Sequence, residues 1–366
     1  MKKILIVSGD PSGDLHSSLL MREIRKLKPE IQFIGIGGEK MIAEGLEALA
    51  PMSEVSVVGF WEVAKKYNFF KNLLDKCKDI IKKGDIDIFI PVDYPGFNIR
   101  LAEFSKNFGV PVYYYIAPQL WAWGKNRSKK LARVVDKLLV VFPFEVEYFS
   151  NFGIDTKFIG HPLLDNKNYS ENFMTNVERN GKIAFFPGSR KQEIRKHLDL
   201  FVKILKYNEA SGYKHQFTVA RSSNIPLSEF SMLSLYKNVE ICSDNTGIMR
   251  TSSAGIIKTG TSNLEAALSG MPFAMFYKTS FLTYTIAERL VNLPYISIVN
   301  ILSNQFVIQE FIQQRAEAEL ILDYINMLMK NQDEYRRIQN QFLELRKNLG
   351  EGGASLKAAE HILEAL

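Results

Sequence analysis

Small, polar and acidic residues crowd together directly after the first apolar run of the chain. Residues 8–16 read SGDPSGDLH, whereas a plain connection needs only one or two turn residues. Glycines let backbone N–H groups approach a ligand closely, so this composition indicates a binding site. The ordinary alternative is a strand–helix turn in which Ser12 or Asp14 caps a helix that begins near Leu15. The segment is not G-x-G-x-x-G, so the dinucleotide fingerprint is absent. The candidate residues are Asp10, Ser12, Gly13, Asp14 and His16.

A single carboxylate follows another apolar run, at residues 86–91. In PVDYPGFNIRLA, Asp93 comes directly after this run, and Asn98 and Arg100 follow closely. A carboxylate at the carboxyl end of a strand, inside a cleft, is where a general base would lie. The ordinary alternative is an aspartate that caps the helix carrying Asn98.

Aromatic residues lie close to polar and basic ones at positions 119–127. Trp121 and Trp123 flank Ala122, so in extended structure their side chains would point the same way. Together with Gln119 and the neighbouring basic residues, they could line a cleft for a sugar or a lipid phosphate. Packing between two domains is an equally good interpretation.

Two glycine turns each lie between a predicted strand and a predicted helix, an arrangement that binds anions. In FFPGSR, backbone N–H groups, a helix N-terminus and the Arg190 guanidinium converge, as a diphosphate requires. In KTGTSNLE, a second helix N-terminus could hold an anion while Glu265 accepts hydrogen bonds from a ribose. A bare turn and a helix-capping glutamate are the ordinary alternatives. The candidate residues are Gly188, Ser189, Arg190, Gly260, Thr261, Ser262 and Glu265.

Composition limits the classes of protein to which the chain can belong. Its 366 residues are enough for two ordinary domains, and 46% hydrophobic residues are typical of a globular protein. The net charge of +6 favours an anionic substrate or membrane surface, but no dense basic stripe indicates nucleic acid. Two cysteines give no disulfide framework, and the histidine spacing predicts no metal site. The first apolar run is too short for a signal peptide, so we expect a cytoplasmic protein.

Strand-length apolar runs alternate with helix-length amphipathic stretches, and these elements must position the clusters. This alternation predicts an α/β fold with parallel sheets, in which ligands collect at the carboxyl ends of strands. The predicted strands of the first half are Ile4–Val7, Phe33–Ile36, Ile86–Pro91, Val112–Ile116, Lys137–Val141 and Lys157–Ile159. The predicted helices there are Leu19–Leu27, Phe60–Lys82 and Ile99–Phe108.

A polar stretch, Asn166–Asn180, divides the pattern, which restarts at KIAFFPGSR. The sequence therefore predicts two Rossmann-like domains facing a cleft. We expect the first domain at 1–170 and the second at 171–340, with helices of about 340–366 joining the first.

Aromatic and basic residues also occur together at 58–83, where VGFWEVAKKYNFFKNLLDKCKDIIKK suits a membrane interface. The apolar residues of its second half follow at helical spacing and are expected to pack on the sheet. The predicted membrane or acyl-chain contacts are Phe60, Trp61, Phe69 and Phe70.

Taken in order, these motifs resemble the lipid A disaccharide synthases, inverting glycosyltransferases of the GT-B type. The resemblance covers nearly the whole chain, and the number of ordered motifs makes it specific. The motifs are SGDPSGDLH, GIGGEKM, VVGFWEV, VDYPGFNIRLA, YYIAPQLWAW, FPFEVEYF, FIGHPLLD, PGSRKQEI, TGTSNLEAAL, PYISIVNIL and GGASLKAAEHIL.

The resemblance implies a reaction and a place for it. UDP-2,3-diacylglucosamine is joined to 2,3-diacylglucosamine 1-phosphate (lipid X), giving a β-1,6-linked disaccharide 1-phosphate and UDP. The family uses no metal or other cofactor and works at the inner face of the cytoplasmic membrane in lipopolysaccharide biosynthesis. The first domain would then face the acceptor and the membrane, and the second would bind the UDP-sugar. The sequence leaves a homodimer open.

The family pattern also places an essential aspartate at Asp93 and an essential arginine at Arg190, the two residues selected above. Asp10 is a second candidate for the base, at a position where the family usually has glutamate. Gly96 stands where the family often has a carboxylate, whereas Asn300 is kept and is expected to line the cleft.

Three other functions compete with this interpretation. One is another UDP-sugar enzyme of the GT-B type, such as a peptidoglycan-type transferase or a 2-epimerase. A second is a dehydrogenase, against which the missing dinucleotide fingerprint argues. The third is a lipid-binding protein without catalysis, against which the retention of Asp93, Arg190 and Glu265 argues.

Overall fold

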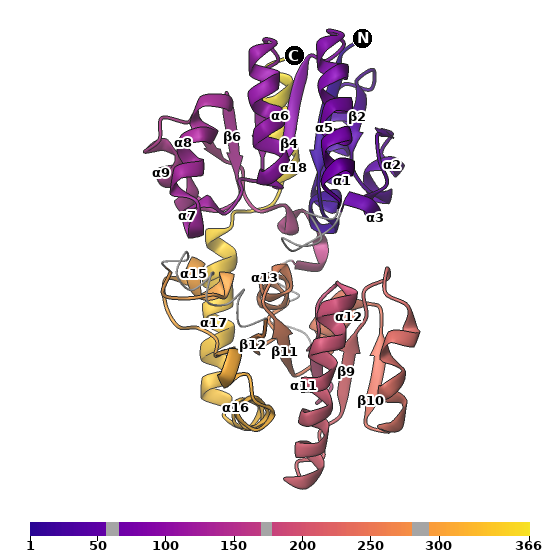
Figure 1. Cartoon of the computed structure of the whole chain (residues 1–366). Helices are drawn as coiled ribbons and strands as arrows, with labels where there is room; N and C mark the ends of the chain where they lie inside the picture. The colour runs from indigo at the N-terminus through magenta and orange to yellow at the C-terminus, as the bar shows by residue number, and fades with distance from the viewer. Residues whose placement is uncertain (56–65, 170–177, 280–292) are drawn as a thin grey trace. The chain divides into compact units, whose positions relative to one another are not determined.

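Two α/β units make up the chain (Figure 1). The computed structural model describes residues 1–55, 66–169, 178–279 and 293–366. The first unit comprises residues 1–165 and 349–366, and the second comprises residues 166–348. Each unit contains one parallel β-sheet with helices packed against it.

The first unit has a seven-stranded sheet in the order β3-β2-β1-β4-β5-β6-β7. Its strands are β1 (Lys3–Ser8), β2 (Gln32–Ile36), β3 (Leu46–Ala48), β4 (Ile88–Val92), β5 (Tyr113–Tyr115), β6 (Lys137–Val140) and β7 (Thr156–Phe158). Its helices are α1 (Pro11–Leu27), α2 (Glu39–Ala43), α3 (Met52–Val55), α5 (Tyr67–Lys82), α6 (Pro95–Asn107), α7 (Leu120–Trp123), α8 (Lys125–Val134), α9 (Pro143–Ser150), η1 (Pro162–Asp165) and α18 (Ala354–Leu363).

The second unit has a six-stranded sheet in the order β10-β9-β8-β11-β12-β13. Its strands are β8 (Ile183–Phe186), β9 (Phe217–Ala220), β10 (Val239–Cys242), β11 (Ala254–Lys258), β12 (Phe273–Tyr277) and β13 (Glu310–Ile312). Its helices are η2 (Lys167–Tyr169), α11 (Lys191–Ala210), η3 (Leu227–Leu235), α12 (Asn245–Thr251), α13 (Thr261–Leu268), α15 (Ile298–Ser303), η4 (Gln313–Arg315), α16 (Ala318–Lys330) and α17 (Gln332–Asn348).

The central strands read as continuous apolar runs because helices cover both of their faces. Ile4, Leu5, Ile6 and Val7 of β1 are fully buried, and so are the residues on both faces of β4. Parallel strands buried on both sides need this pattern rather than alternation. These buried runs are the sequence signal that predicted the sheets.

The last helix, α18, returns to the first unit and packs against α1. Its amino end is fixed by Asp165, whose two carboxylate oxygens accept hydrogen bonds from the N–H groups of Ala354 and Ser355, each at 2.9 Å. A carboxylate at this place satisfies donors that have no partner within the helix.

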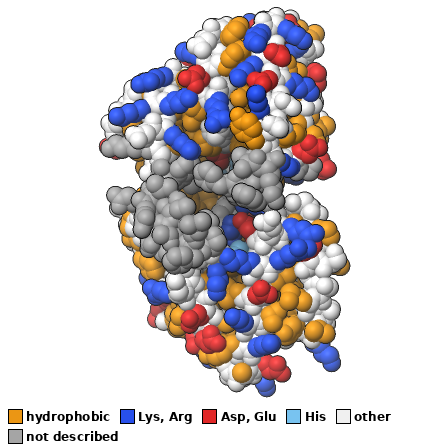
Figure 2. Space-filling model, in the orientation of Figure 1, with side chains coloured by type: hydrophobic (Ala, Val, Ile, Leu, Met, Phe, Trp, Pro, Cys, Tyr) orange, Lys and Arg blue, Asp and Glu red, His pale blue; other side chains and the backbone are white. Residues whose placement is uncertain are grey.

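Charge is mixed over the visible surface. Figure 2 shows Lys and Arg side chains interspersed with Asp and Glu on this face of both units. Among the described residues of this face, no continuous basic band appears that would follow a nucleic-acid backbone.

Candidate active site

The candidate residues follow strands at the point where each sheet reverses its strand order. In the first unit β1 and β4 are neighbours. After β1 the chain continues to β2, towards one edge of the sheet, and after β4 it continues to β5, towards the other edge. In the second unit β8 and β11 have the same relationship. Crevices form at such switch points because the connections diverge there, and ligands bind in them. Asp10 and Asp93 follow one pair of strands, and Arg190 and Gly260 follow the other.

Asp93 lies in a strained turn. Its φ is 41° and that of Tyr94 is 50°, so two consecutive residues have left-handed backbone, which is unfavourable for residues other than glycine. The turn is held by Asn98, whose Nδ2 donates to the Asp93 carbonyl at 2.8 Å, and by the Tyr114 hydroxyl, which donates to the same oxygen at 2.5 Å. Strain maintained by its surroundings in this way is common at functional sites.

Asn98 itself is fully buried and also joins the two strands of the switch point. Its Nδ2 lies 3.2 Å from the carbonyl oxygens of Val7 and Val92, at the ends of β1 and β4. The predicted cleft residue therefore supports the turn that carries Asp93 instead of presenting its amide to solvent.

The electrostatics of Asp93 differ from those of an ordinary surface aspartate. The surrounding protein desolvates the carboxylate, and the nearby Asp10 adds a second negative charge; together they raise the pKa of Asp93 to about 7. The side chain remains exposed, so a substrate can reach it. A carboxyl group with this pKa can take up a proton near neutral pH, as a general base must.

The Ser8–His16 segment holds the ends of β1 and β4 together. A side chain at Gly9 would place its Cβ 2.4 Å from the Tyr94 ring, so only glycine allows this close approach. Asp10 is the N-cap of α1, and its carboxylate accepts a hydrogen bond from Gly13 N at 2.7 Å. The prediction that Ser12 or Asp14 caps a helix beginning near Leu15 was wrong, because the helix begins at Pro11.

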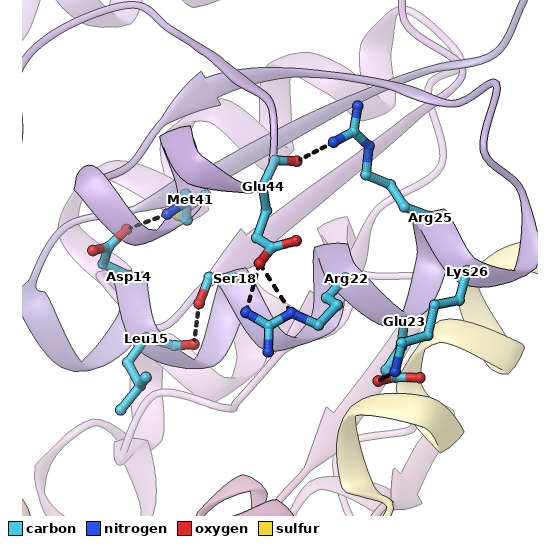
Figure 3. A network of polar contacts seen from close by, with 9 residues as sticks. All are labelled: Asp14, Leu15, Ser18, Arg22, Glu23, Arg25, Lys26, Met41 and Glu44. Carbon is cyan, nitrogen blue, oxygen red and sulfur yellow. Dashed lines mark hydrogen bonds and ion pairs between the residues drawn. The ribbon is translucent and has the colours of Figure 1, made fainter.

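Asp14 serves a different helix. Its buried carboxylate accepts hydrogen bonds from the backbone N–H groups of Gly38 at 2.8 Å and Met41 at 3.0 Å, at the start of α2. Figure 3 shows Asp14 beside Met41, and further along α1 the ion pair between Arg22 and Glu44. These contacts fix α2 on α1. Asp14 therefore stabilises the Ser8–His16 segment instead of presenting its carboxylate to a ligand.

His16 is buried in contact with a second histidine. The rings of His16 and His161 meet edge to face, with centroids 6.0 Å apart. Burial lowers the pKa of His16 to about 4 and that of His161 to about 3. Both imidazoles are therefore neutral at physiological pH.

Trp121 is held by a buried carboxyl group that sequence reasoning did not select. The Trp121 Nε1 donates to Glu145 Oε1 at 3.0 Å, and the other Glu145 oxygen accepts from Phe142 N at 3.1 Å. Burial raises the pKa of Glu145 to about 8, and the negative charge of Asp93 acts in the same direction. Gln119 is exposed at the start of α7.

The chain around Trp121 is helical, so the alignment of side chains that extended structure would give does not apply. Residues 120–123 form the short helix α7, and residues two apart in a helix do not share a face. Trp121 instead packs edge to face on Phe144, with ring centroids 5.0 Å apart.

In the second unit, the loop after β8 carries an ion cluster. Arg190 is the N-cap of α11, and its Nη1 lies 3.1 Å from Glu193 Oε1. Lys258, the last residue of β11, lies 3.1 Å from the same oxygen. Both cations lower the pKa of Glu193 despite its partial burial. Sequence reasoning selected Arg190 but neither Glu193 nor Lys258.

The second glycine turn begins α13. Gly260 is the N-cap, with φ 146°, and a Cβ added there would meet no atom within 4 Å. Thr261 and Ser262 are the first two residues of the helix and do not cap it. Glu265 interacts with the hydroxyl groups of Ser262 and Tyr169, and desolvation raises its pKa. The Glu265 carboxyl group thus already interacts with hydroxyl groups, which are the partners that a ribose would offer.

Asn300 is fully buried and organises a loop. Its Oδ1 accepts from the N–H groups of Val307 and Ile308 at 2.9 and 3.0 Å, and its Nδ2 donates to the buried Glu310 at 2.9 Å. The side chain that we expected to line the cleft is therefore engaged with the segment between α15 and β13.

The predicted membrane contacts are only partly described. Phe60 and Trp61 lie outside the described residues. Phe69 and Phe70 are half-buried and pack against the core of the first unit, with ring centroids 5.3 Å apart. In the described parts of the chain, no helix has the length and apolar character needed to cross a bilayer.

Comparison with known proteins gives a consistent result over the whole chain. Residues 4–365 match the family model described as lipid-A-disaccharide synthetase. The lipid-A-disaccharide synthase of Geobacter metallireducens is 34% identical over 374 residues, covering 100% of this chain and 97% of the relative. The enzyme of the same name from Coxiella burnetii is 30% identical, covering 98% and 97%.

Solved structures with low sequence identity share the fold. UDP-GlcNAc 2-epimerase from Neisseria meningitidis, bound to UDP-GlcNAc, has a TM-score of 0.65 at 12% identity and covers 99% of this chain and 100% of its own. Phytolacca americana UGT2, complexed with UDP-2fluoro-glucose and pterostilbene, has a TM-score of 0.60 at 11% identity and covers 100% and 99%. These likenesses establish the GT-B type of fold.

Proposed function

Because this chain belongs to the lipid-A-disaccharide synthetase family, a family of glycosyltransferases, we propose how its two half-sites share the reaction. The donor is UDP-2,3-diacylglucosamine and the acceptor is lipid X. The first unit holds the acceptor and supplies the base. The second unit binds the UDP of the donor.

The reaction exchanges one bond for another at the anomeric carbon. The acceptor 6-hydroxyl oxygen forms a bond to this carbon from the face opposite the leaving group. The bond to the UDP oxygen breaks with its electron pair, and the configuration inverts. The hydroxyl proton passes to a base, for which we assign the Asp93 carboxylate.

The single observation that supports this assignment is the state of Asp93. It is exposed, lies in a strained turn fixed by Asn98 and Tyr114, and has a pKa raised to about 7. A base with a pKa near the working pH combines availability with proton affinity. Asp10 lies close enough to raise this pKa, but its own carboxylate is engaged as a helix cap.

For the donor, the loops at the switch point of the second unit provide the contacts. Arg190 and the amino end of α11 supply positive charge for the diphosphate, and the Gly260–Ser262 turn offers further N–H groups. Glu265, already beside two hydroxyl groups, would accept hydrogen bonds from the ribose. The charge that develops on departing UDP would be stabilised by the same groups.

The decisive experiment supplies both acylated sugars to the purified protein and detects disaccharide phosphate and UDP. Activity with the acylated pair, and none when the donor is UDP-GlcNAc, is the expected result. Formation of an epimerised UDP-sugar without disaccharide would overturn the proposal. Arg190→Ala and Glu265→Ala should each weaken UDP binding, and undiminished affinity in both would remove the second unit from the donor site.

Both substrates carry acyl chains, so the enzyme must meet them at a lipid surface. We assign this contact to the first unit, at the inner face of the cytoplasmic membrane. Phe69 and Phe70 at the start of α5 support it, because they are only half-buried and are flanked by Lys66 and Lys71. Rings at the headgroup boundary and amines beside anionic lipid are the usual elements of such a contact.

A further inference from the structure

One carboxylate holds two cations at the switch point of the second unit. Arg190 Nη1 and Lys258 Nζ each lie 3.1 Å from Glu193 Oε1, so these two nitrogens are at most 6.2 Å apart. The cations come from different elements: Arg190 lies in the loop after β8, and Lys258 is the last residue of β11. The side chains are 37% exposed for Arg190, 17% for Lys258 and 25% for Glu193.

Glycine geometry makes room for this cluster. Gly188 has φ 109°, and a side chain there would place its Cβ 2.8 Å from Glu193 Oε2. The loop after β8 therefore packs closely against the Glu193 carboxylate, which contacts both cations. An anion bound to this loop would meet the Arg190 guanidinium and the Lys258 ammonium together.

We propose that Lys258 is a second diphosphate-binding residue, which Glu193 positions together with Arg190. The inference deepens the donor assignment made above and rests on it. Each phosphate of a UDP-sugar carries a negative charge, whereas Arg190, Lys258 and Glu193 sum to a single positive charge. The cluster therefore keeps a net positive charge before the UDP-sugar binds. Both cations can donate hydrogen bonds to its phosphates.

The two cations suit different tasks. The planar Arg190 guanidinium can form two parallel hydrogen bonds to phosphate oxygens, whereas the Lys258 ammonium acts as a compact point charge. When the bond to the sugar breaks, the departing oxygen gains negative charge, and a second cation close to the first lowers the energy of that state. Lys258 therefore contributes both to donor binding and to the departure of UDP.

The test measures UDP and uridine binding calorimetrically, in the absence of lipid, with Lys258→Gln, Lys258→Arg and wild type. Loss of a charge-assisted phosphate contact should weaken UDP binding about 10-fold or more in Lys258→Gln. Uridine binding should not change, Lys258→Arg should recover most of the affinity, and the loss should shrink as salt is raised. A merely structural lysine would alter thermal stability without this dependence on phosphate and salt.

The matched control is Lys182→Gln, which also removes a lysine from an ion pair, the one with Glu240 at 2.7 Å in the same unit. It should bind UDP as wild type does. If Arg190→Ala weakens UDP binding while Lys258→Gln leaves it unchanged, the role of Lys258 is refuted and the donor site stands. If neither variant weakens it, the donor assignment itself fails.

Discussion

Replacing Asp93 by asparagine should remove most of the activity and at the same time stabilise the protein. Asparagine keeps the size of the side chain and tolerates the left-handed backbone at φ 41°, so the turn should survive. Loss of a general base lowers the rate by about 10²–10⁴-fold. Activity should fall while stability rises, because the fold holds the Asp93 carboxylate in an environment that disfavours its charge.

The gain in stability follows from the raised pKa. The native pKa of Asp93 is about 7 against 3.8 for the ordinary group, so the unfolded state ionises first as pH rises. The free energy of unfolding therefore falls as pH rises from about 4 to about 7, and it stays at this lower level above pH 7. The difference corresponds to about 4 kcal/mol for a fully buried group. Because the side chain is exposed, screening reduces this cost to on the order of 1–2 kcal/mol.

Urea unfolding of wild type and Asp93→Asn at pH 5 and pH 8 measures this effect. The advantage of the variant should grow between the two pH values, and kcat/KM of the wild type should rise through about pH 7. Asp79→Asn, an exposed carboxylate on α5, is the matched control and should change neither quantity appreciably. Near-wild-type turnover in Asp93→Asn would refute the reasoning and transfer the role to another group.

The neighbouring Asp10 provides an independent check on the same electrostatics. Asparagine is as good an N-cap as aspartate, so Asp10→Asn should preserve α1. Removal of the negative charge should lower the pKa of Asp93 and move the rising limb of the pH–rate profile to lower pH. An unmoved limb would show that the two carboxylates do not interact as described.

Three further outcomes are expected. Glu145→Gln should destabilise the protein by about 1–3 kcal/mol in chemical unfolding at about pH 4, where the carboxyl group is largely protonated in both states, because the amide nitrogen cannot accept the hydrogen bond that the second carboxyl oxygen accepts; an unchanged stability at this pH would contradict this. The native pKa values of His16 and His161 lie below 6.5, so the unfolded state binds protons first and the free energy of unfolding should fall as pH drops from about 6.5 towards 4. The fall should be smaller in His161→Gln, and an equal fall in both proteins would exclude these residues as its source. Replacing Phe69 and Phe70 by Ser should reduce sedimentation with anionic vesicles in a variant that still unfolds cooperatively, and unchanged binding would assign both rings to the core alone.

The order of apolar runs and turn motifs was enough to predict two α/β halves. Strands buried on both faces must be apolar throughout, so β1 and β4 were visible as short uninterrupted runs. Glycine turns after strands indicated where ligands would be held, and the ordered motifs indicated the family. These signals are local, because each depends on residues adjacent in the chain.

Only the tertiary structure decided what each polar side chain does. Asp14, Asn98 and Asn300 looked like site residues in sequence, yet burial commits them to backbone groups of other segments. Conversely, no local pattern in the sequence indicated Glu145 or Lys258. Glu145 contacts Trp121, 24 positions away, and Lys258 contacts Glu193, 65 positions away. A buried polar group must find a hydrogen-bond partner, and the fold determines which distant segment supplies it. Residue types and their order therefore specified the family and the half-sites, whereas contacts between distant segments specified which side chains are free to meet a substrate.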